Sequence, residues 1–226
     1  PYLLGDYEHH SSASIGVAMF SGCDDVAEEI LKRADMAMYQ AKSAGRNTLR
    51  FFDPKMQAVV SARAALEAGL REAVQKMHFT LVLQPQVDST CRVIGAEALL
   101  RWQPPESGEV SPRAFIPLAE ETGLILPIGQ WVLDTACERI AGWANDPEMA
   151  ELTIAVNISA RQFLQKDFVD NVLRTVRRYH ADPRRLKLEL TESMLVHDMD
   201  DVIGKMQALQ AAGMGLSLDD FGTGYS

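Results

Sequence analysis

The stretch from Met214 to Ser226, M-G-L-S-L-D-D-F-G-T-G-Y-S, decides how we expect this chain to fold. Apolar residues alternate with small or polar ones as far as Asp219, which is typical of a strand with one packed face. Asp219 and Asp220 end the strand, and F-G-T-G then allows unusual backbone angles close to a ligand. We interpret this as the carboxyl end of a barrel strand that carries ligands for a hard metal ion. The alternative is that the two aspartates only cap a turn.

Upstream of this stretch, strands and helices alternate. The pattern predicts strands over 79–87, 93–102, 152–158, 186–191 and 214–219, with helices over about 128–144, from 168 to near 183, and from 202 to 213. The first two strands are joined only by residues 88–92, which favours an antiparallel hairpin. The later strands, separated by helices, should be parallel. We therefore predict an α/β fold, either a TIM-type (β/α)8 barrel with an antiparallel first strand or a doubly wound open sheet.

The residues before this region are expected to form a smaller α/β piece and a connecting helix. Residues 14–20 are predicted as a strand, a helix should begin with an Asp25/Glu28 capping box and end at Gly45, and residues 48–52 could return as an edge strand. Over 54–78, an apolar stripe that ends in Val74 and Met77 predicts a helix that packs on a domain. A linker that transmits movement between domains is the alternative.

Composition excludes several classes of protein. With 22 basic and 31 acidic residues the net charge is −9, which argues against a polymeric nucleic acid as a partner. No apolar run is long enough to span a bilayer, and the first residues lack a signal peptide, so we expect a soluble, cytoplasmic chain whose membrane anchor, if any, lies outside these residues. Cys23, Cys91 and Cys137 are far apart and are expected to be reduced thiols.

Oxygen-bearing side chains stand at or near the ends of separate predicted strands. These are Glu97, Asn157, Glu189 and Asp219, with Asp220 beside the last. Such ligands suit Mg²⁺ or Mn²⁺ rather than zinc or copper. Arg101 follows Glu97 by four residues and could grip a phosphate bidentately.

Each of these residues also has a purely structural interpretation. Glu97 could pair with Arg101, Asn157 could cap a loop, and Glu189 could form an ion pair with Lys187 or Arg185. Their coincidence at equivalent strand ends favours the metal site.

The same residues carry a resemblance to the EAL domain, a cyclic di-GMP phosphodiesterase family. The matching motifs are Gln84-Pro85, the E-A-L-L-R of residues 97–101, F-I-P-L-A-E of 115–120, N-I-S of 157–159, E-L-T-E of 189–192 and D-D-F-G-T-G-Y-S of 219–226. The resemblance implies that Glu97, Asn157, Glu189 and Asp219 hold one metal ion and that Asp219 and Asp220 help to hold a second. It also implies that Gln84 and Arg101 contact the dinucleotide and that hydrolysis yields linear pGpG.

The beginning of the chain resembles a second family. The run A-D-M-A-M-Y-Q-A-K-S-A-G-R-N of residues 34–47, preceded by S-I-G-V-A at 14–18, is similar to the C-terminal end of a GGDEF domain, which makes cyclic di-GMP. The Gly-Gly-Asp-Glu-Phe signature of that family is absent from these residues, so no cyclase activity is expected of them. We predict a GGDEF part over 1–53, a linker helix over 54–78 and an EAL part over 79–226.

Departures from the EAL pattern set a further expectation. By the resemblance, a general-base glutamate and an active-site lysine belong to strands beyond Ser226, and five strands are predicted where a complete barrel has eight. We therefore expect a fragment that is itself inactive and poorly soluble. The intact parent is expected to be a metal-dependent phosphodiesterase that dimerises through its EAL domain. The alternatives are a non-catalytic cyclic di-GMP receptor and a dimerising signalling scaffold.

Overall fold

The computed structural model describes residues 2–4, 7–9, 11–20, 26–104, 108–191 and 199–219. They fall into two compact units, residues 1–68 and residues 69–226.

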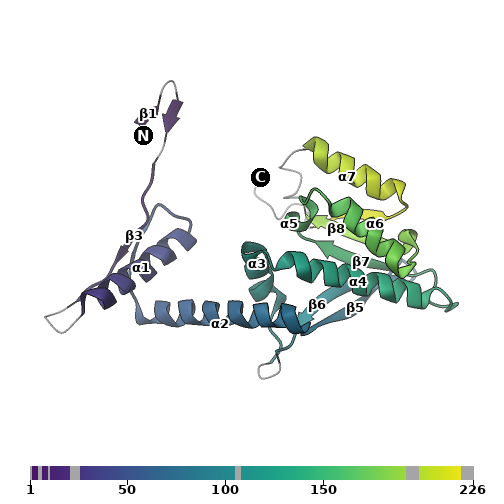
Figure 1. Cartoon of the computed structure of the whole chain (residues 1–226), viewed down its shortest axis with the longest axis horizontal. Helices are drawn as coiled ribbons and strands as arrows, with labels where there is room; N and C mark the ends of the chain where they lie inside the picture. Colours follow the sequence, from purple (N-terminus) through teal and green to yellow (C-terminus); the bar gives the residue numbers. More distant parts are fainter. Residues whose placement is uncertain are drawn as a thin grey trace. The chain divides into compact units, whose positions relative to one another are not determined.

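The described residues of the first unit include two short strand pairs, helix α1 and the first part of helix α2 (Figure 1). Strands β1 (Tyr2–Leu4) and β2 (Tyr7–His9) form an antiparallel pair that the sequence did not suggest. Strands β3 (Ile15–Val17) and β4 (Leu49–Phe51) pair in parallel, and α1 (Ala27–Ser43) connects them. Helix α1 packs directly on β3 at Gly16, where an added Cβ would lie 2.0 Å from a helix carbonyl oxygen.

The predicted strand, helix and edge strand of this unit are present in the predicted order, but their ends differ from the prediction. Strand β3 is shorter than the predicted 14–20, and the edge strand is present. Asp25 lies outside the described residues, and α1 follows Val26, which makes no side-chain cap. The predicted end of α1 is close to the observed one: the helix ends at Ser43, and Gly45, two residues later, takes a positive φ of 100°.

Helix α2 (Pro54–Lys76) is the predicted connecting helix. The side chain of Asp53 accepts a hydrogen bond from the backbone N–H of Lys55 and so satisfies one free donor of the first turn. Leu70 in the apolar stripe is fully buried. Met77 was expected to continue this stripe, and that prediction is wrong: its φ of 55° ends the helix and leaves the side chain 45% exposed.

The second unit is built on one sheet in the order β5-β6-β7-β8-β9 (Figure 1). Its strands are β5 (Phe79–Val87), β6 (Val93–Trp102), β7 (Thr153–Ile158), β8 (Leu186–Thr191) and β9 (Gly215–Asp219). Strands β5 and β6 are antiparallel and the following pairs are parallel. This confirms the antiparallel first strand that the short connection over 88–92 predicted.

Helices connect the strands of this sheet. They are α3 (Pro112–Thr122), α4 (Ile125–Trp143), α5 (Ala160–Phe163), α6 (Phe168–Tyr179), the 3₁₀ helix η1 (Pro183–Arg185) and α7 (Met199–Ala211). Helix α3 was not predicted from the sequence, and α4 begins three residues before its predicted start at 128. Pro112 begins α3 in the position where a missing N–H costs least, and Phe115 and Ala119 are fully buried.

One face of the sheet packs against the helices to form the core, with α4 and α6 beside β7 and β8 in Figure 1. The residues that meet there include Ile154, Val156, Ile158, Leu186, Leu188 and Leu190 from the strands and Val132, Ala136, Ile140, Val172 and Val176 from the helices. The alternating pattern of β7 and β8 therefore predicted the core face correctly. The sequence predicted that β9 also has a packed face as far as its end, but Leu218 near the end of β9 is 38% exposed.

Membrane-spanning segments and the state of the cysteines were also considered in the sequence. Within the described residues, no helix has both the length and the apolar character that crossing a membrane requires. Cys91 is exposed and Cys137 is buried, which raises the pKa of its thiol to about 12, while Cys23 lies outside the described residues.

Candidate active site at the carboxyl ends of the strands

The parallel register brings Glu97 and Asn157 together from neighbouring strands. Glu97 is level with Ala155, and the side-chain amide nitrogen of Asn157 donates a 2.8 Å hydrogen bond to Glu97 Oε1. The predicted place of Glu97 near a strand end is wrong, because β6 continues to Trp102 through its pairing with β5. The pairing of β6 with β7, however, does end near Glu97: the last paired residues are Ala98 and Val156.

Glu189 lies beside Asn157 on the next strand and is more buried than Glu97. Its side chain is 8% exposed, and its Oε1 accepts hydrogen bonds from Lys187 Nζ at 2.9 Å and from Ser217 Oγ at 3.4 Å. The Lys187 ion pair is the structural alternative considered for Glu189. The other partner considered, Arg185, instead pairs with Glu151.

The two aspartates are placed only in part. Asp219 is level with Thr191 of β8, so its backbone stands at the same end of the sheet as Glu189. Nothing is described of its side chain, and Asp220 lies outside the described residues. The metal roles of both aspartates stay predictions.

The two predicted substrate-binding residues flank this row. Gln84 on β5 is exposed and stands opposite Glu97 in the antiparallel register. Arg101 does not pair with Glu97: its Nε lies 3.2 Å from Glu109 Oε1, and its guanidinium also donates to the carbonyl of Leu100. Glu109 was missed in the sequence analysis, and no periodicity or motif would have linked it to Arg101.

The donor chemistry of the row fits a hard cation. The amide nitrogen of Asn157 donates to Glu97, so Asn157 Oδ1 is an oxygen that could bind a cation beside the carboxylates of Glu97 and Glu189. Among the side chains that are described, no three acidic, histidine or cysteine groups gather as a cation site. The described donors are therefore two carboxylates and one amide, the oxygen set that magnesium and manganese prefer.

A hollow of about 260 Å³ opens beside these residues, between β6, β7 and helices α3 and α4. Arg101, Asn157 and Glu120 are among the residues that line it. Partial burial raises the pKa of Glu120, and the nearby charge of Arg161 opposes that rise. Glu120 belongs to the F-I-P-L-A-E motif, but its part in this hollow was not foreseen.

The turn after Asn157 is held by a capping box. The Ser159 side chain accepts from the Gln162 backbone N–H at 3.2 Å, and Gln162 Oε1 accepts from the Ser159 backbone N–H at 3.2 Å. Gln162 is buried against Gly129 of α4, where an added Cβ would lie only 1.7 Å from the amide. The S-x-x-Q spacing was a readable signal for this cap, and the sequence analysis did not use it.

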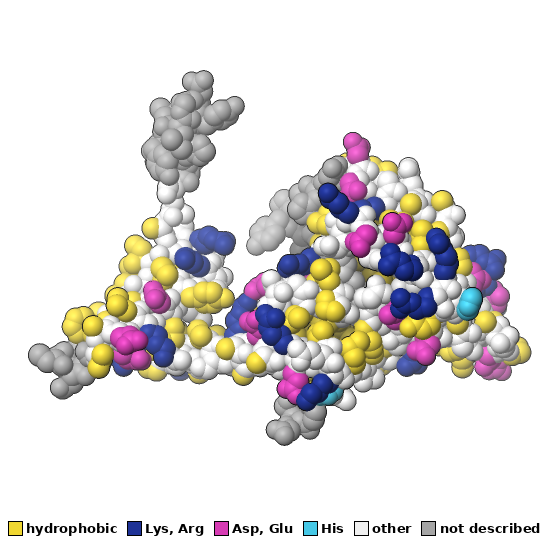
Figure 2. All heavy atoms as spheres, in the orientation of Figure 1, with side chains coloured by type: hydrophobic (Ala, Val, Ile, Leu, Met, Phe, Trp, Pro, Cys, Tyr) yellow, Lys and Arg dark blue, Asp and Glu magenta, His cyan; other side chains and the backbone are white. Residues whose placement is uncertain are grey.

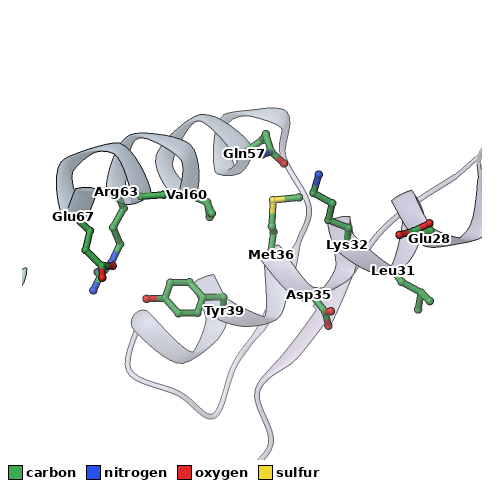
Figure 3. A pocket seen from close by; sticks show the side chains of 11 residues that line it. Glu28, Leu31, Lys32, Asp35, Met36, Tyr39, Gln57, Val60, Arg63 and Glu67 are labelled. Atoms are coloured by element: carbon green, nitrogen blue, oxygen red, sulfur yellow. The ribbon is translucent and has the colours of Figure 1, made fainter. Parts of the chain in front are cut away.

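A second, larger hollow of about 730 Å³ lies in the first unit between α1 and α2 (Figure 3). Glu28, Lys32 and Asp35 of α1 line it together with Met36 and Val60. It contains none of the strand residues singled out for metal or phosphate, and its charges have mixed sign. The row on the sheet is therefore the better candidate for chemistry.

Comparisons with known proteins identify the family of the chain. The EAL domain family model matches residues 67–226, and the model "Diguanylate cyclase, GGDEF domain" matches residues 1–48. The bifunctional diguanylate cyclase/cyclic di-GMP phosphodiesterase MucR of Pseudomonas aeruginosa is 43% identical over 227 residues, which cover 100% of this chain and 33% of MucR. The cyclic di-GMP phosphodiesterase PdeR of Escherichia coli is 34% identical over 226 residues, covering 100% of this chain and 34% of PdeR.

A solved structure shows the same fold. The PaMucR phosphodiesterase in complex with c-di-GMP matches with a TM-score of 0.68 and 44% identity, covering 72% of this chain and 66% of that one. EAL domains have a TIM-like barrel fold, so the predicted barrel, rather than a doubly wound sheet, is confirmed. This chain spans about a third of the length of the curated relatives it matches. On these matches, this chain belongs to the EAL domain family, and its first residues match the GGDEF domain.

Proposed function

We propose that the intact protein carrying this chain hydrolyses cyclic di-GMP to linear pGpG in bacterial second-messenger signalling, with two bound Mg²⁺ or Mn²⁺ ions. The observation that carries the proposal is the row of oxygen ligands on consecutive strands, in which Asn157 and Glu97 are within hydrogen-bond distance and Glu189 is adjacent. The relatives named above support the substrate.

In this proposal Glu97, Asn157, Glu189 and Asp219 hold one cation, and Asp219 and Asp220 help to hold the second. When bound, the cations supply activation of the attacking water and neutralisation of charge on the phosphate and the leaving oxygen. The chain's own contribution is to fix the ligands on rigid strands. The hydrogen bond from Asn157 orients Glu97, and the hydrogen bond from Ser217 orients Glu189.

Arg101 and Gln84 bind the dinucleotide in this proposal. The planar guanidinium of Arg101 can hold a phosphate through two parallel hydrogen bonds once it leaves Glu109. On the face shown in Figure 2, basic and acidic side chains are interspersed. Because the net charge is −9, we expect recognition of an anionic dinucleotide to depend on a few placed groups such as Arg101 rather than on an excess of basic residues.

The arrangement of domains and subunits is also proposed. We assign residues 1–53 to a GGDEF part, 54–78 to a linker helix and 79–226 to an EAL part that forms a homodimer in the intact protein. We expect the 226 residues alone to be inactive, because the general-base glutamate and the lysine of the family belong to further strands.

Glu97→Ala in the intact protein tests the proposal. Loss of a metal ligand should abolish the appearance of pGpG, measured by chromatography with Mg²⁺ or Mn²⁺ present, whereas Glu138→Ala on the exposed side of α4 should have no effect. Unchanged turnover in Glu97→Ala would refute the metal assignment. A wild-type protein that binds the dinucleotide without cleaving it would be a receptor, and one that does neither would be a scaffold.

A further inference from the structure

Lys187 lies next to the proposed metal site. It is on β8, two residues before Glu189 and therefore on the same face of the sheet. Its side chain is 33% exposed, and its ammonium lies 2.9 Å from Glu189 Oε1. Lys187 is therefore in direct contact with a carboxylate that is more buried than that of Glu97.

The neighbouring strands leave room for this lysine. At the same level of the sheet, Lys187 is flanked by Ala155 on β7 and Gly215 on β9. A Cβ added to Gly215 would lie 3.3 Å from Lys187 Cγ, so a larger residue there would press on the lysine stem. Because both neighbours are small, the aliphatic part of the Lys187 side chain can lie along the sheet and place its ammonium beside Glu189.

This ion pair and a divalent cation would compete for the negative charge of Glu189. Glu189 Oε1 already accepts from Lys187 and, more weakly, from Ser217. A divalent ion on the same carboxylate would stand a few ångströms from the ammonium, where like charges repel strongly in a partly buried environment. Without a metal, however, Glu189 needs a positive partner because its side chain is nearly buried.

We propose that Lys187 is an internal counter-ion of Glu189 that stabilises the metal-free site and competes with the divalent cation. This inference rests on the proposed function. Lys187 is a positioning residue in this role: metal binding draws Glu189 away from the ammonium, and the lysine lowers the affinity for the first ion.

Lys187→Met in the full-length protein tests this, because methionine keeps the length of the stem without the charge. Mn²⁺ binding is measured by titration calorimetry, and thermal unfolding is followed with and without Mn²⁺. We expect Lys187→Met to bind Mn²⁺ about tenfold more tightly, because removing a nearby positive charge favours a divalent ion. Without metal, the midpoint of thermal unfolding of Lys187→Met should be lower than that of wild type. Adding Mn²⁺ should raise this midpoint by more than it raises the wild-type midpoint. Lys166→Met, on an exposed lysine, should change neither.

The outcomes separate this inference from the proposed function. If wild type binds Mn²⁺ and Glu97→Ala does not, the metal assignment stands; equal or weaker binding by Lys187→Met would then overturn the counter-ion role alone. If wild type binds no Mn²⁺, both fall. Should Lys187→Met be too unstable to titrate, the double variant Lys187→Met/Glu189→Gln, which removes the unpaired charge, should regain stability. A double variant as unstable as the single one would refute the role.

Discussion

The side-chain amide of Asn157 donates a 2.8 Å hydrogen bond to the carboxylate of Glu97, a residue sixty positions earlier in the chain. Their backbones are not level, since Glu97 pairs with Ala155. The two side chains meet because they lie on the same face of adjacent parallel strands. This contact gives the proposed site its first two ligands before any ion is bound.

Asn157→Ala should therefore weaken Mn²⁺ binding by at least about tenfold, because it removes one ligand and the group that orients another. Titration calorimetry on the full-length protein measures this. Asn145→Ala, in the exposed turn after α4, is the matched control and should bind like wild type. Equal affinities of the two variants would contradict the assignment of Asn157.

The ion pair between Arg101 and Glu109 predicts a competition for the dinucleotide. Glu109→Gln should tighten cyclic di-GMP binding by up to about fivefold, the range expected from releasing a partly exposed ion pair. Arg101→Lys should weaken it, because lysine cannot form the two parallel bonds. Binding is measured with Ca²⁺ in place of the catalytic ion; looser binding by Glu109→Gln would show that Glu109 supports Arg101 instead.

Gly129 and Gly142 in α4 form a matched pair for testing the cap after Asn157. Alanine at 129 would collide with Gln162 and should lower the free energy of unfolding by about 1–3 kcal/mol. Alanine at 142 meets nothing within 4 Å and should raise it by up to about 1 kcal/mol. Chemical denaturation measures both. Similar effects at the two sites would mean that Gln162 does not need the space at Gly129.

Asp182 gives a prediction about acid stability. It accepts the Arg184 backbone N–H at 2.9 Å and the guanidinium at 2.8 Å, and the side-chain hydrogen bond to Arg184 lowers its pKa below the usual 3.8. The stabilisation is thus present above pH 3.8 and is lost as the pH falls through the lowered value. Asp182→Ala should cost about 1 kcal/mol at pH 7, and the difference should shrink in acid.

Asp182→Asn separates the two parts of this effect. Asparagine can keep the backbone cap, so it should be closer to wild type than alanine at pH 7, and it carries no charge to titrate. Stability curves from pH 2.5 to pH 7 measure both variants. If Asp182→Ala keeps a constant difference from wild type over this range, the charge of Asp182 contributes nothing.

The sequence by itself determined the family and most of the sheet. The bounds of β5, β6 and β8 were predicted correctly, because their apolar patterns are local and turn residues bound them. Asp88 shows the local cause: its carboxylate accepts the backbone N–H groups of Thr90 and Arg92 and so closes the hairpin. The ion pair between Lys187 and Glu189 could also be predicted from the local sequence, because both residues lie on the same face of one strand.

Only the tertiary structure decided which side chains meet. The position of Glu97 in the middle of β6 depends on the pairing of β6 with β5. The hydrogen bond from Asn157 to Glu97 depends on the register between β6 and β7. Arg101 forms its ion pair with Glu109 and not with Glu97. Helix α3 likewise depends on the burial of Phe115 rather than on a clear periodic signal. These outcomes rest on contacts between distant parts of the chain, which a local pattern of residues does not contain.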